Sequence, residues 1–455
     1  MQRIALSVGV LWGAWGCSRG APARSDEAQE VRVETQADVG SPEPDRTCRD
    51  WSKEDLDALP PLPAGEHVAT LDEVWRTVVQ KHYDPTLGCV DWLRVREVHA
   101  DAVARAEDHR QAYAAINRML DELEQSHFRL FETSGGDDAM LPASPALQVR
   151  WIEESLVVVS SEDESVPTGS VIVSVDGKPA SELVERARVR TKGQSASAFA
   201  FAAARAAMVA LSCPRAGATK PVEIALGDDT PQPRVVRCED PSGELVSLGN
   251  LTNVPTHVEH RMIEGTKVGY LAFNVWMLPM IERVRGALTQ LRAQGMQALV
   301  LDLRGNPGGV GPMSVPVARM LLDRSASLGT LRFRDFEQAF NVEPDADPFT
   351  GPLALLVDEG TASTSEIFAA GMRDLDRVTI FGGQPTAGAA LPSVIEELPS
   401  GAVLQYVVGD YHSPKGTAVE GKGIAPDVRV TETRADFVAG RDPVLEAAVT
   451  ALTER

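Results

Sequence analysis

The part of the chain after residue 268 alternates short apolar runs with amphipathic stretches, and this alternation limits the possible folds more than any other feature. We expect strands at 268–276, 298–303, 353–357 and 378–381, and helices at 280–294, 312–322 and 363–375. The runs at 298–303 and 353–357 are apolar at nearly every position, as in strands that are covered on both faces. This order predicts an α/β core in which helices cover a largely parallel sheet.

Two other patterns precede this core. Residues 48–139 show helical spacing of apolar side chains and predict a helical bundle. Residues 140–248 contain β-branched runs and an Asp176-Gly177 turn, and the strand and turn at 169–179 resemble the end of a PDZ domain. We therefore predict a multidomain α+β chain: the helical bundle, a PDZ-like β-rich domain with a helical insertion at 195–211, the α/β core at 249–440 and a C-terminal helix at 441–455.

The first 17 residues have the pattern of an export signal. An apolar stretch at 4–15 follows Gln2 and Arg3 and ends at Ala14-Trp15-Gly16-Cys17, which resembles a bacterial lipoprotein cleavage box. Ordinary signal-peptidase cleavage is the alternative to lipidation of Cys17, and we favour lipidation. The polar residues 18–47 predict a flexible linker. We expect a periplasmic or outer-membrane-attached lipoprotein, or a secreted protein, that touches a membrane only through this N-terminal anchor.

Four further cysteines indicate disulfides. Cys48, Cys89, Cys213 and Cys238 allow three pairings, and we favour Cys48–Cys89 with Cys213–Cys238 because each pair lies inside one predicted domain. The sequence has no Cys-x-x-Cys motif or Cys/His cluster, so we expect neither a metal nor another cofactor. The net charge of −21 argues against nucleic acid as a partner.

The residues that point to chemistry lie where predicted strands end. The strand at 353–357 turns through Gly360 and places Ser363 on the first turn of a helix, where unpaired amides such as that of Thr364 can hold an oxyanion. The alternative is structural, because Ser363-x-x-Glu366 is also a capping box. Glycine-rich turns at 304–309 and 382–389 follow two other strands and add backbone amides at the same edge.

Four motifs occur in a familiar order: LDLRGNPGG at 301–309, VDEGTASTSEIFAAGMRD at 357–374, FGGQPTAGA at 381–389 and VEGKGIAPDV at 419–428. Together they resemble the C-terminal-processing (tail-specific) peptidase family, which also contains the tricorn core and the interphotoreceptor retinoid-binding proteins. The resemblance implies a serine peptidase that acts on peptides or unfolded proteins without a cofactor. It implies that Ser363 is the nucleophile, with Ser365 as the runner-up.

The chain departs from this family at one important position. Tail-specific members carry a lysine as general base where this sequence has Ala389. The tricorn-like branch uses a histidine instead, in a segment that residues 119–128 resemble, which implies His127 as the base; Ser126 beside it is a further contributor. We favour His127 over His82 and His412.

The same branch supplies a glutamate shortly before a G-V-x-P-D motif, which implies Glu420. We expect the oxyanion to bind the Thr364 amide together with Gly308 or Gly309. Lys415 and Lys422 are the alternatives as base.

We therefore predict a serine endopeptidase or carboxy-terminal-processing peptidase that forms an acyl-enzyme on Ser363. The alternative is a catalytically inactive ligand-binding or peptide-binding lipoprotein on the same scaffold. The missing lysine favours this alternative, whereas the intact serine turn and the histidine favour the enzyme.

Overall fold

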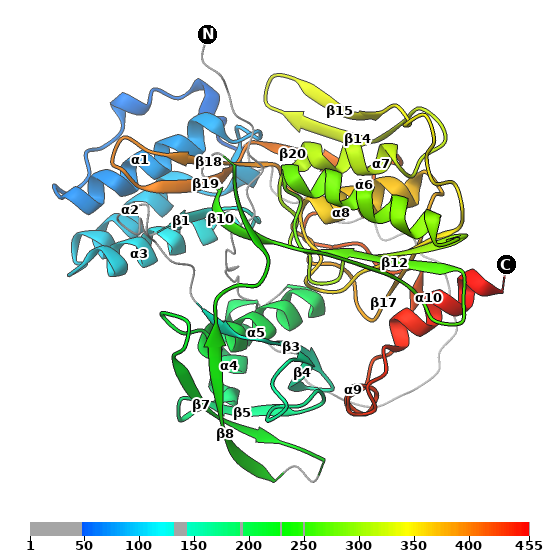
Figure 1. Cartoon of the computed structure of the whole chain (residues 1–455). Coiled ribbons are helices and arrows are strands. Elements are labelled where there is room, and N and C mark those ends of the chain that lie inside the picture. The colour runs from blue at the N-terminus through cyan, green and yellow to red at the C-terminus, as the bar shows by residue number, and fades with distance from the viewer. Residues whose placement is uncertain (1–47, 132–142, 192–193, 228–229, 249–250, 455) are drawn as a thin grey trace, which may run out of the picture.

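The computed structural model describes residues 48–131, 143–191, 194–227, 230–248 and 251–454 (Figure 1). The predicted signal peptide, Cys17 and the linker at 18–47 lie outside these residues. So do residues 135–138, where we placed the break between the helical and β-rich parts.

A six-stranded sheet forms the centre of the C-terminal part. Its strand order is β11-β12-β13-β16-β17-β21, in which β11 is antiparallel and the other strands are parallel. The strands are β11 (Val258–Met262), β12 (Val268–Phe273), β13 (Ala298–Asp302), β16 (Leu353–Leu356), β17 (Thr379–Gly382) and β21 (Val428–Arg429). The four strands predicted from apolar runs are the four central ones.

Helices cover both faces of this sheet, as the doubly apolar strands require. Leu299 and Leu301 of β13 face one hydrophobic cluster, whereas Ala298 and Val300 face another. The first face carries α6 (Leu278–Ala293), α7 (Ser314–Arg319) and α8 (Thr364–Asp374), and α10 (Pro443–Thr453) covers the second. A short helix, α9 (Arg434–Val438), precedes α10.

The predicted helix at 312–322 is shorter than expected. A 3-10 turn at Gly311–Met313 precedes α7, and the amides of Met320 and Leu321 bond to carbonyls three residues back. These tighter bonds end the α-helix early because they replace the bonds to the fourth residue. A small antiparallel sheet of β14 (Ala326–Phe333), β15 (Glu337–Val342) and β20 (Gly409–His412) lies beside this region; the sequence patterns did not predict it.

The N-terminal unit contains α1 (Glu66–Lys81), α2 (Trp92–Ala104) and α3 (His109–Asp121), with 3-10 turns at Trp51–Lys53, Leu56–Ala58 and Leu87–Cys89. It also contains a three-stranded sheet in the order β1-β19-β18, built from β1 (Arg129–Phe131), β18 (Ser393–Glu397) and β19 (Val403–Val407). Figure 1 shows this late hairpin lying beside α1. We assigned residues 393–407 to the core; instead, Leu404 and Tyr406 are buried against the N-terminal helices because their pairing with β1 carries them there.

In the sequence, a β-rich unit lies between the N-terminal unit and the core. Its sheet runs β2-β8-β7-β5-β4-β3, with β6 on β5, and two helices, α4 and α5, pack on it. The elements are β2 (Ser144–Pro145), β3 (Leu147–Ile152), β4 (Ser155–Ser161), β5 (Val171–Val175), β6 (Lys178–Pro179), α4 (Ala180–Arg190), α5 (Ala196–Leu211), β7 (Thr219–Ala225) and β8 (Pro231–Glu239).

The boundary that we predicted at 248 divides a hairpin. Strand β9 (Glu244–Leu248) pairs with β10 (Leu251–Thr256), so the chain does not change unit at this point. Val246 and Leu248 pack against the core cluster that lies under α6. The core unit therefore begins before β9. Although β9 follows the strands of the β-rich unit in the sequence, its apolar side chains pack against the core.

Candidate active site

Ser363 lies between strand β16 and helix α8, at the position where the sequence predicts a sharp turn. It is the N-cap of α8, it is 2 % exposed, and its φ of 55° and ψ of −119° are rare for a residue with a side chain. Its amide donates to the carbonyl of Ala389 and to the Glu366 carboxylate. The second bond belongs to a capping box, so Ser363 both caps the helix and presents its hydroxyl outside it.

His127 lies in the segment between α3 and β1, far from Ser363 in sequence. Its Nε2 is 3.2 Å from Ser363 Oγ, and its Nδ1 is 2.6 Å from Ser126 Oγ. The backbone of His127 also has a positive φ, 63°. Burial lowers the pKa of His127 to about 4, so the imidazole is neutral at neutral pH and can accept a proton.

Ser126 joins this histidine to a buried carboxylate. Its hydroxyl donates to Glu420 Oε2 over 3.0 Å, and its amide donates to Glu420 Oε1 over 2.8 Å. Because the Ser126 hydroxyl donates to Glu420, it accepts from Nδ1 of His127, which leaves Nε2 to accept from Ser363. Burial raises the pKa of Glu420 to about 8, against the bonds from Ser126 and the Ala390 amide.

A second carboxylate, Glu366, holds the turn after β17 against the serine. It accepts from the amides of Gly388 and Ala389, each at 2.8 Å, and from the Thr386 hydroxyl. Burial raises its pKa to about 7. Sequence reasoning treated Glu366 only as a capping residue, and the capping box was the one signal that drew attention to it.

The predicted oxyanion donors adjoin the serine but differ in availability. Gly308 has a φ of +98°, and a Cβ there would come within 2.7 Å of Ser363 Cβ and 2.9 Å of the Thr364 amide, so only glycine fits. The Gly308 amide already donates to Asn306 Oδ1 at 3.0 Å. The Gly309 carbonyl accepts from the Thr364 hydroxyl.

The alternative serine and histidines have other partners. The Ser365 hydroxyl is buried between Trp276 Nε1 and Asn306 Oδ1, at 2.8 and 3.0 Å. His82 bonds to Gln125 and to the Asp84 carbonyl. His412 lies 2.8 Å from Asp410.

The alternative lysines do not enter the site either. Lys415 pairs with Asp376 on the surface, and Lys422 is exposed and does not line the cavity at Ser363. Ala389 lines this cavity, at the position where the resemblance implies a lysine.

The cysteines form two disulfides, Cys48–Cys89 and Cys213–Cys238. Each closes a loop within one unit. Among the described residues, no group of three or more His, Cys, Asp or Glu side chains could hold a metal ion. The described helices include none long and apolar enough to cross a membrane.

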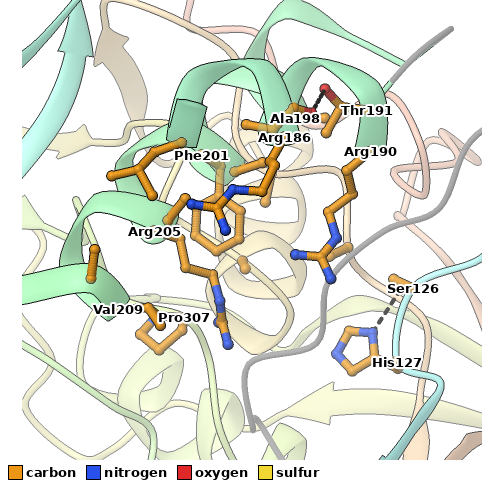
Figure 2. Close-up of a pocket in the computed structure, with 18 of the residues that line it drawn as sticks. Ser126, His127, Arg186, Arg190, Thr191, Ala198, Phe201, Arg205, Val209 and Pro307 are labelled. Atoms are coloured by element: carbon orange, nitrogen blue, oxygen red, sulfur yellow. Dashed lines mark hydrogen bonds between the residues drawn. The ribbon is translucent and has the colours of Figure 1, made fainter. Parts of the chain in front are cut away.

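A cavity of about 640 Å³ opens in front of Ser363 and His127. The other side of this cavity is built by α4 and α5 of the β-rich unit, and Figure 2 shows arginines from both helices directed into it. The arrangement thus combines a polarised serine, a neutral imidazole and a space large enough for several residues of a peptide.

Residues 267–430 match the model of peptidase family S41. The carboxyl-terminal-processing protease of Synechocystis sp. is 27 % identical over 405 residues, which cover 85 % of this chain and 87 % of that protein. The chloroplastic carboxyl-terminal-processing peptidase 2 of Arabidopsis thaliana is 27 % identical over 357 residues, with 78 % and 67 % covered.

Two solved structures share the fold. The photosystem II D1 C-terminal processing protease has a TM-score of 0.53 at 22 % identity and covers 81 % of this chain and 94 % of its own. Mature CPAF complexed with lactacystin has a TM-score of 0.62 at 15 % identity, with 86 % and 99 % covered. These relatives support the peptidase prediction over the binding-protein alternative. Residues 267–430 thus carry the peptidase domain of family S41, and the chain is a serine-type peptidase similar to the carboxyl-terminal-processing proteases.

Proposed function

We propose that this peptidase cleaves peptide bonds through an acyl-enzyme on Ser363, with His127 as general base and with Ser126 and Glu420 orienting the histidine. The observation that carries the proposal is the continuous hydrogen-bond chain from Ser363 through His127 and Ser126 to Glu420. It provides a nucleophile, a base and an orienting group, which are the three roles that serine catalysis requires.

The proposed reaction has two halves. In the first, Ser363 Oγ attacks the carbonyl carbon of the substrate while its proton moves to His127 Nε2. The imidazolium then gives this proton to the leaving nitrogen, and the C–N bond breaks. In the second half, water gives a proton to His127 and attacks the ester carbon. The ester C–O bond then breaks, the imidazolium returns the proton to Ser363 Oγ, and the carboxylic acid product leaves.

Two charged groups form during the proposed reaction, the His127 imidazolium and the oxyanion, and neighbouring groups stabilise each of them. The imidazolium donates through Nδ1 to Ser126, whose hydroxyl is in turn bonded to Glu420. We assign the Thr364 amide as the main oxyanion donor because it begins α8, where helix amides lack partners within the helix. Gly308 and Gly309 remain the second donors, and the Gly308 amide would have to exchange Asn306 for the oxyanion.

The β-rich unit is proposed to act as a PDZ-like module for an extended peptide. Strand β3 is at one edge of its sheet and pairs with β4 alone among the described strands. Helix α5 packs beside it, with Phe199 5.2 Å from Trp151 between ring centroids. An edge strand next to a helix is suited to binding a peptide by strand addition.

Export is part of the same proposal. Two disulfides are typical of proteins that fold in an oxidising compartment. Lipidation at Cys17 rests on its cleavage-box motif alone. The mass of the mature N-terminal peptide from a bacterial membrane fraction tests it, since diacylglyceryl on Cys17 is the expected adduct.

The nucleophile can be tested by covalent labelling. Wild-type protein should react with a serine-directed phosphonate at Ser363, and Ser363→Ala should abolish both labelling and cleavage of unfolded peptides. Loss of the covalent route costs on the order of a millionfold in kcat, whereas loss of a helix cap costs only about 1 kcal/mol of stability.

Ser365→Ala is the matched variant on the same helix. It removes the hydroxyl between Trp276 and Asn306, so it should melt at a lower temperature and still label at Ser363. Wild-type protein that neither labels nor cleaves would leave Ser363 with only its capping role.

A further inference from the structure

The segment 125–128, which contains the proposed base, has little support from the backbone. It lies between α3 and β1, outside the helices and strands. Within the described part of the chain, Gln125, Ser126 and His127 make no backbone-to-backbone hydrogen bond. His127 has a φ of 63°, and Glu124 just before the segment has a φ of 53°. Such conformations persist only where surrounding contacts impose them, so the segment depends on side-chain anchors.

One buried imidazole contacts both ends of this segment. His82 lies at the C-terminal end of α1 and is 0 % exposed. Its Nε2 donates to Gln125 Oε1 over 2.8 Å. Its ring stacks on the ring of Phe128, with 5.9 Å between the centroids and 21° between the planes. Ser126 and His127 are the two residues between these contacts, so His82 holds the proposed base from both sides.

An arginine of the core fixes His82 in turn. Arg334 follows β14 in the small antiparallel sheet. Its guanidinium donates to three carbonyls at the end of α1, those of Val79, Gln80 and His82, over 2.9, 3.2 and 2.9 Å. The last carbonyls of a helix lack partners within the helix, and a cation stabilises them. The end of α1, and with it His82, is therefore bonded to the core.

Strand β14 also supports the helix that carries the nucleophile. Ser363 is the N-cap of α8, and Gly371 lies further along the same helix. Gly371 packs so closely on β14 that a Cβ there would come within 2.8 Å of Leu328 Cα. Strand β14 thus supports α8 directly and the end of α1 through Arg334. His127 and Ser363, which belong to different units, have a common support.

We propose that His82 is a positioning residue for the proposed base: it holds Gln125 and Phe128 so that His127 stays within hydrogen-bond distance of Ser363. The inference rests on the proposed role of His127. The alternative is that His82 only fills the interior of the N-terminal unit. A displacement of about 1 Å at a catalytic group can cost about 10²-fold in rate, so a lost anchor should act on kcat more than on KM.

Two substitutions of His82 separate its two contacts. His82→Phe keeps a ring against Phe128 and removes the bond to Gln125, whereas His82→Gln keeps an N–H donor and removes the ring. We expect His82→Phe to lower kcat, and the rate of phosphonate labelling at Ser363, by about 10- to 100-fold with KM nearly unchanged. His82→Gln should retain more of both rates, because its amide can still donate to Gln125.

Gln125→Leu breaks the same bond from its other end. Its side chain is half-buried, so this variant replaces His82→Phe if the latter does not fold. It should lower kcat by a similar factor, and adding His82→Phe should cause little further loss because both changes remove one interaction. His109→Phe is the matched control: His109 is in the same unit, its ring contacts those of His67 and Tyr113, and its loss should change neither rate.

A normal kcat in His82→Phe would overturn the proposal. So would equal losses in His82→Phe and His82→Gln, or losses that add fully when His82→Phe and Gln125→Leu are combined. Wild-type protein that neither cleaves nor labels would count against Ser363 and His127 instead.

Hydrogen exchange followed by mass spectrometry tests His82 without relying on activity. The Ser126 amide donates to Glu420, and loosening of the segment would free it. The peptide that contains residues 124–128 should exchange about tenfold faster or more in His82→Phe than in wild type, with exchange in α2 and α3 unchanged. Unchanged exchange at 124–128, or an equal rise in all three places, would show that His82 does not position the segment.

Discussion

His127 and Ser363 both have positive φ values, 63° and 55°. Such conformations cost free energy, and they persist where surrounding contacts require them. The contacts here are the bonds of His127 to Ser126 and Ser363, and those of the Ser363 amide to Ala389 and Glu366. In these strained conformations the Ser363 hydroxyl points towards the His127 imidazole.

The first prediction concerns pH. His127 must be neutral to accept a proton, and with its pKa lowered to about 4 it stays neutral as pH falls well below 6.5. Glu420, with its pKa raised to about 8, becomes charged only as pH rises through that value. We expect kcat/KM to rise with pH through about 8, with no inflection near 6.5.

Glu420→Gln identifies the group responsible for this rise. The variant should lose about 10²- to 10⁴-fold in kcat, and its profile should be flat between about pH 5 and pH 8. If the alkaline rise survives in Glu420→Gln and disappears in Lys415→Ala or Lys422→Ala, a lysine is the base and our assignment is wrong.

A second prediction tests Ser126 as a positioning residue. Ser126→Ala removes the acceptor of the His127 Nδ1 proton and a hydroxyl donor to Glu420, so kcat should fall by about 10²- to 10³-fold with KM nearly unchanged. Ser126→Thr keeps a hydroxyl and should restore part of the rate. A purely structural role predicts a lower melting temperature in both variants without this difference in kcat.

At the scale of elements, the site depends on how α8 meets the turn after β17. The side chain of Glu366, on the first turn of α8, accepts from the Thr386 hydroxyl and from the Gly388 and Ala389 amides. The Ala389 carbonyl accepts in turn from the Ser363 amide. One carboxylate thus fixes the turn against the nucleophile.

A third prediction follows from this junction. Glu366→Gln places an amide group against the Gly388 and Ala389 amides, and buried donors left without an acceptor cost about 1–3 kcal/mol each. We expect a lower free energy of unfolding in urea and a lower kcat. Glu397→Gln, an exposed carboxylate on β18, should change neither. An unchanged stability in Glu366→Gln would show that the turn is held by other contacts.

At the scale of the whole molecule, Arg150 joins the β-rich unit to the core. It extends from β3 and bonds to Glu359 at 2.9 and 3.0 Å and to Glu432 at 2.7 Å. Its side chain is 12 % exposed, and those of the two glutamates are 3 % and 5 % exposed. Glu359 belongs to the turn before Ser363, so the link runs from the proposed peptide-binding strand to the nucleophile.

A fourth prediction is that Arg150→Met strongly lowers the free energy of unfolding. Removing one partner of a buried ion pair leaves charge uncompensated and costs about 3–5 kcal/mol. Thermal unfolding should show this loss, and kcat should fall because the turn at 358–361 loses its anchor. Arg441→Gln removes an exposed arginine with two acidic partners and should leave both measurements unchanged. A folded Arg150→Met with normal kcat would mean that the turn keeps its shape without this link.

The predictable parts of this protein are those that depend on neighbouring residues. Apolar runs identified the four central strands because a strand covered on both faces must be apolar throughout. The turn at Ser363 was predictable because its signals, Gly360 and the start of a helix, are close to it in the sequence. The hairpin β18–β19 was misplaced because nothing in its own pattern shows that its partner, β1, lies in the N-terminal unit.

By itself, the sequence determined the order of strands and helices, the turn that carries Ser363 and the pairs of cysteines close enough in the chain to share a unit. Only the tertiary structure decided which histidine adjoins Ser363, since the two residues are 236 positions apart, and which carboxylate meets Ser126, 294 positions away. It also decided that the arginines of α4 and α5 face the nucleophile. The physical reason is that local patterns set backbone geometry, whereas a site assembled from three units depends on how their apolar faces pack.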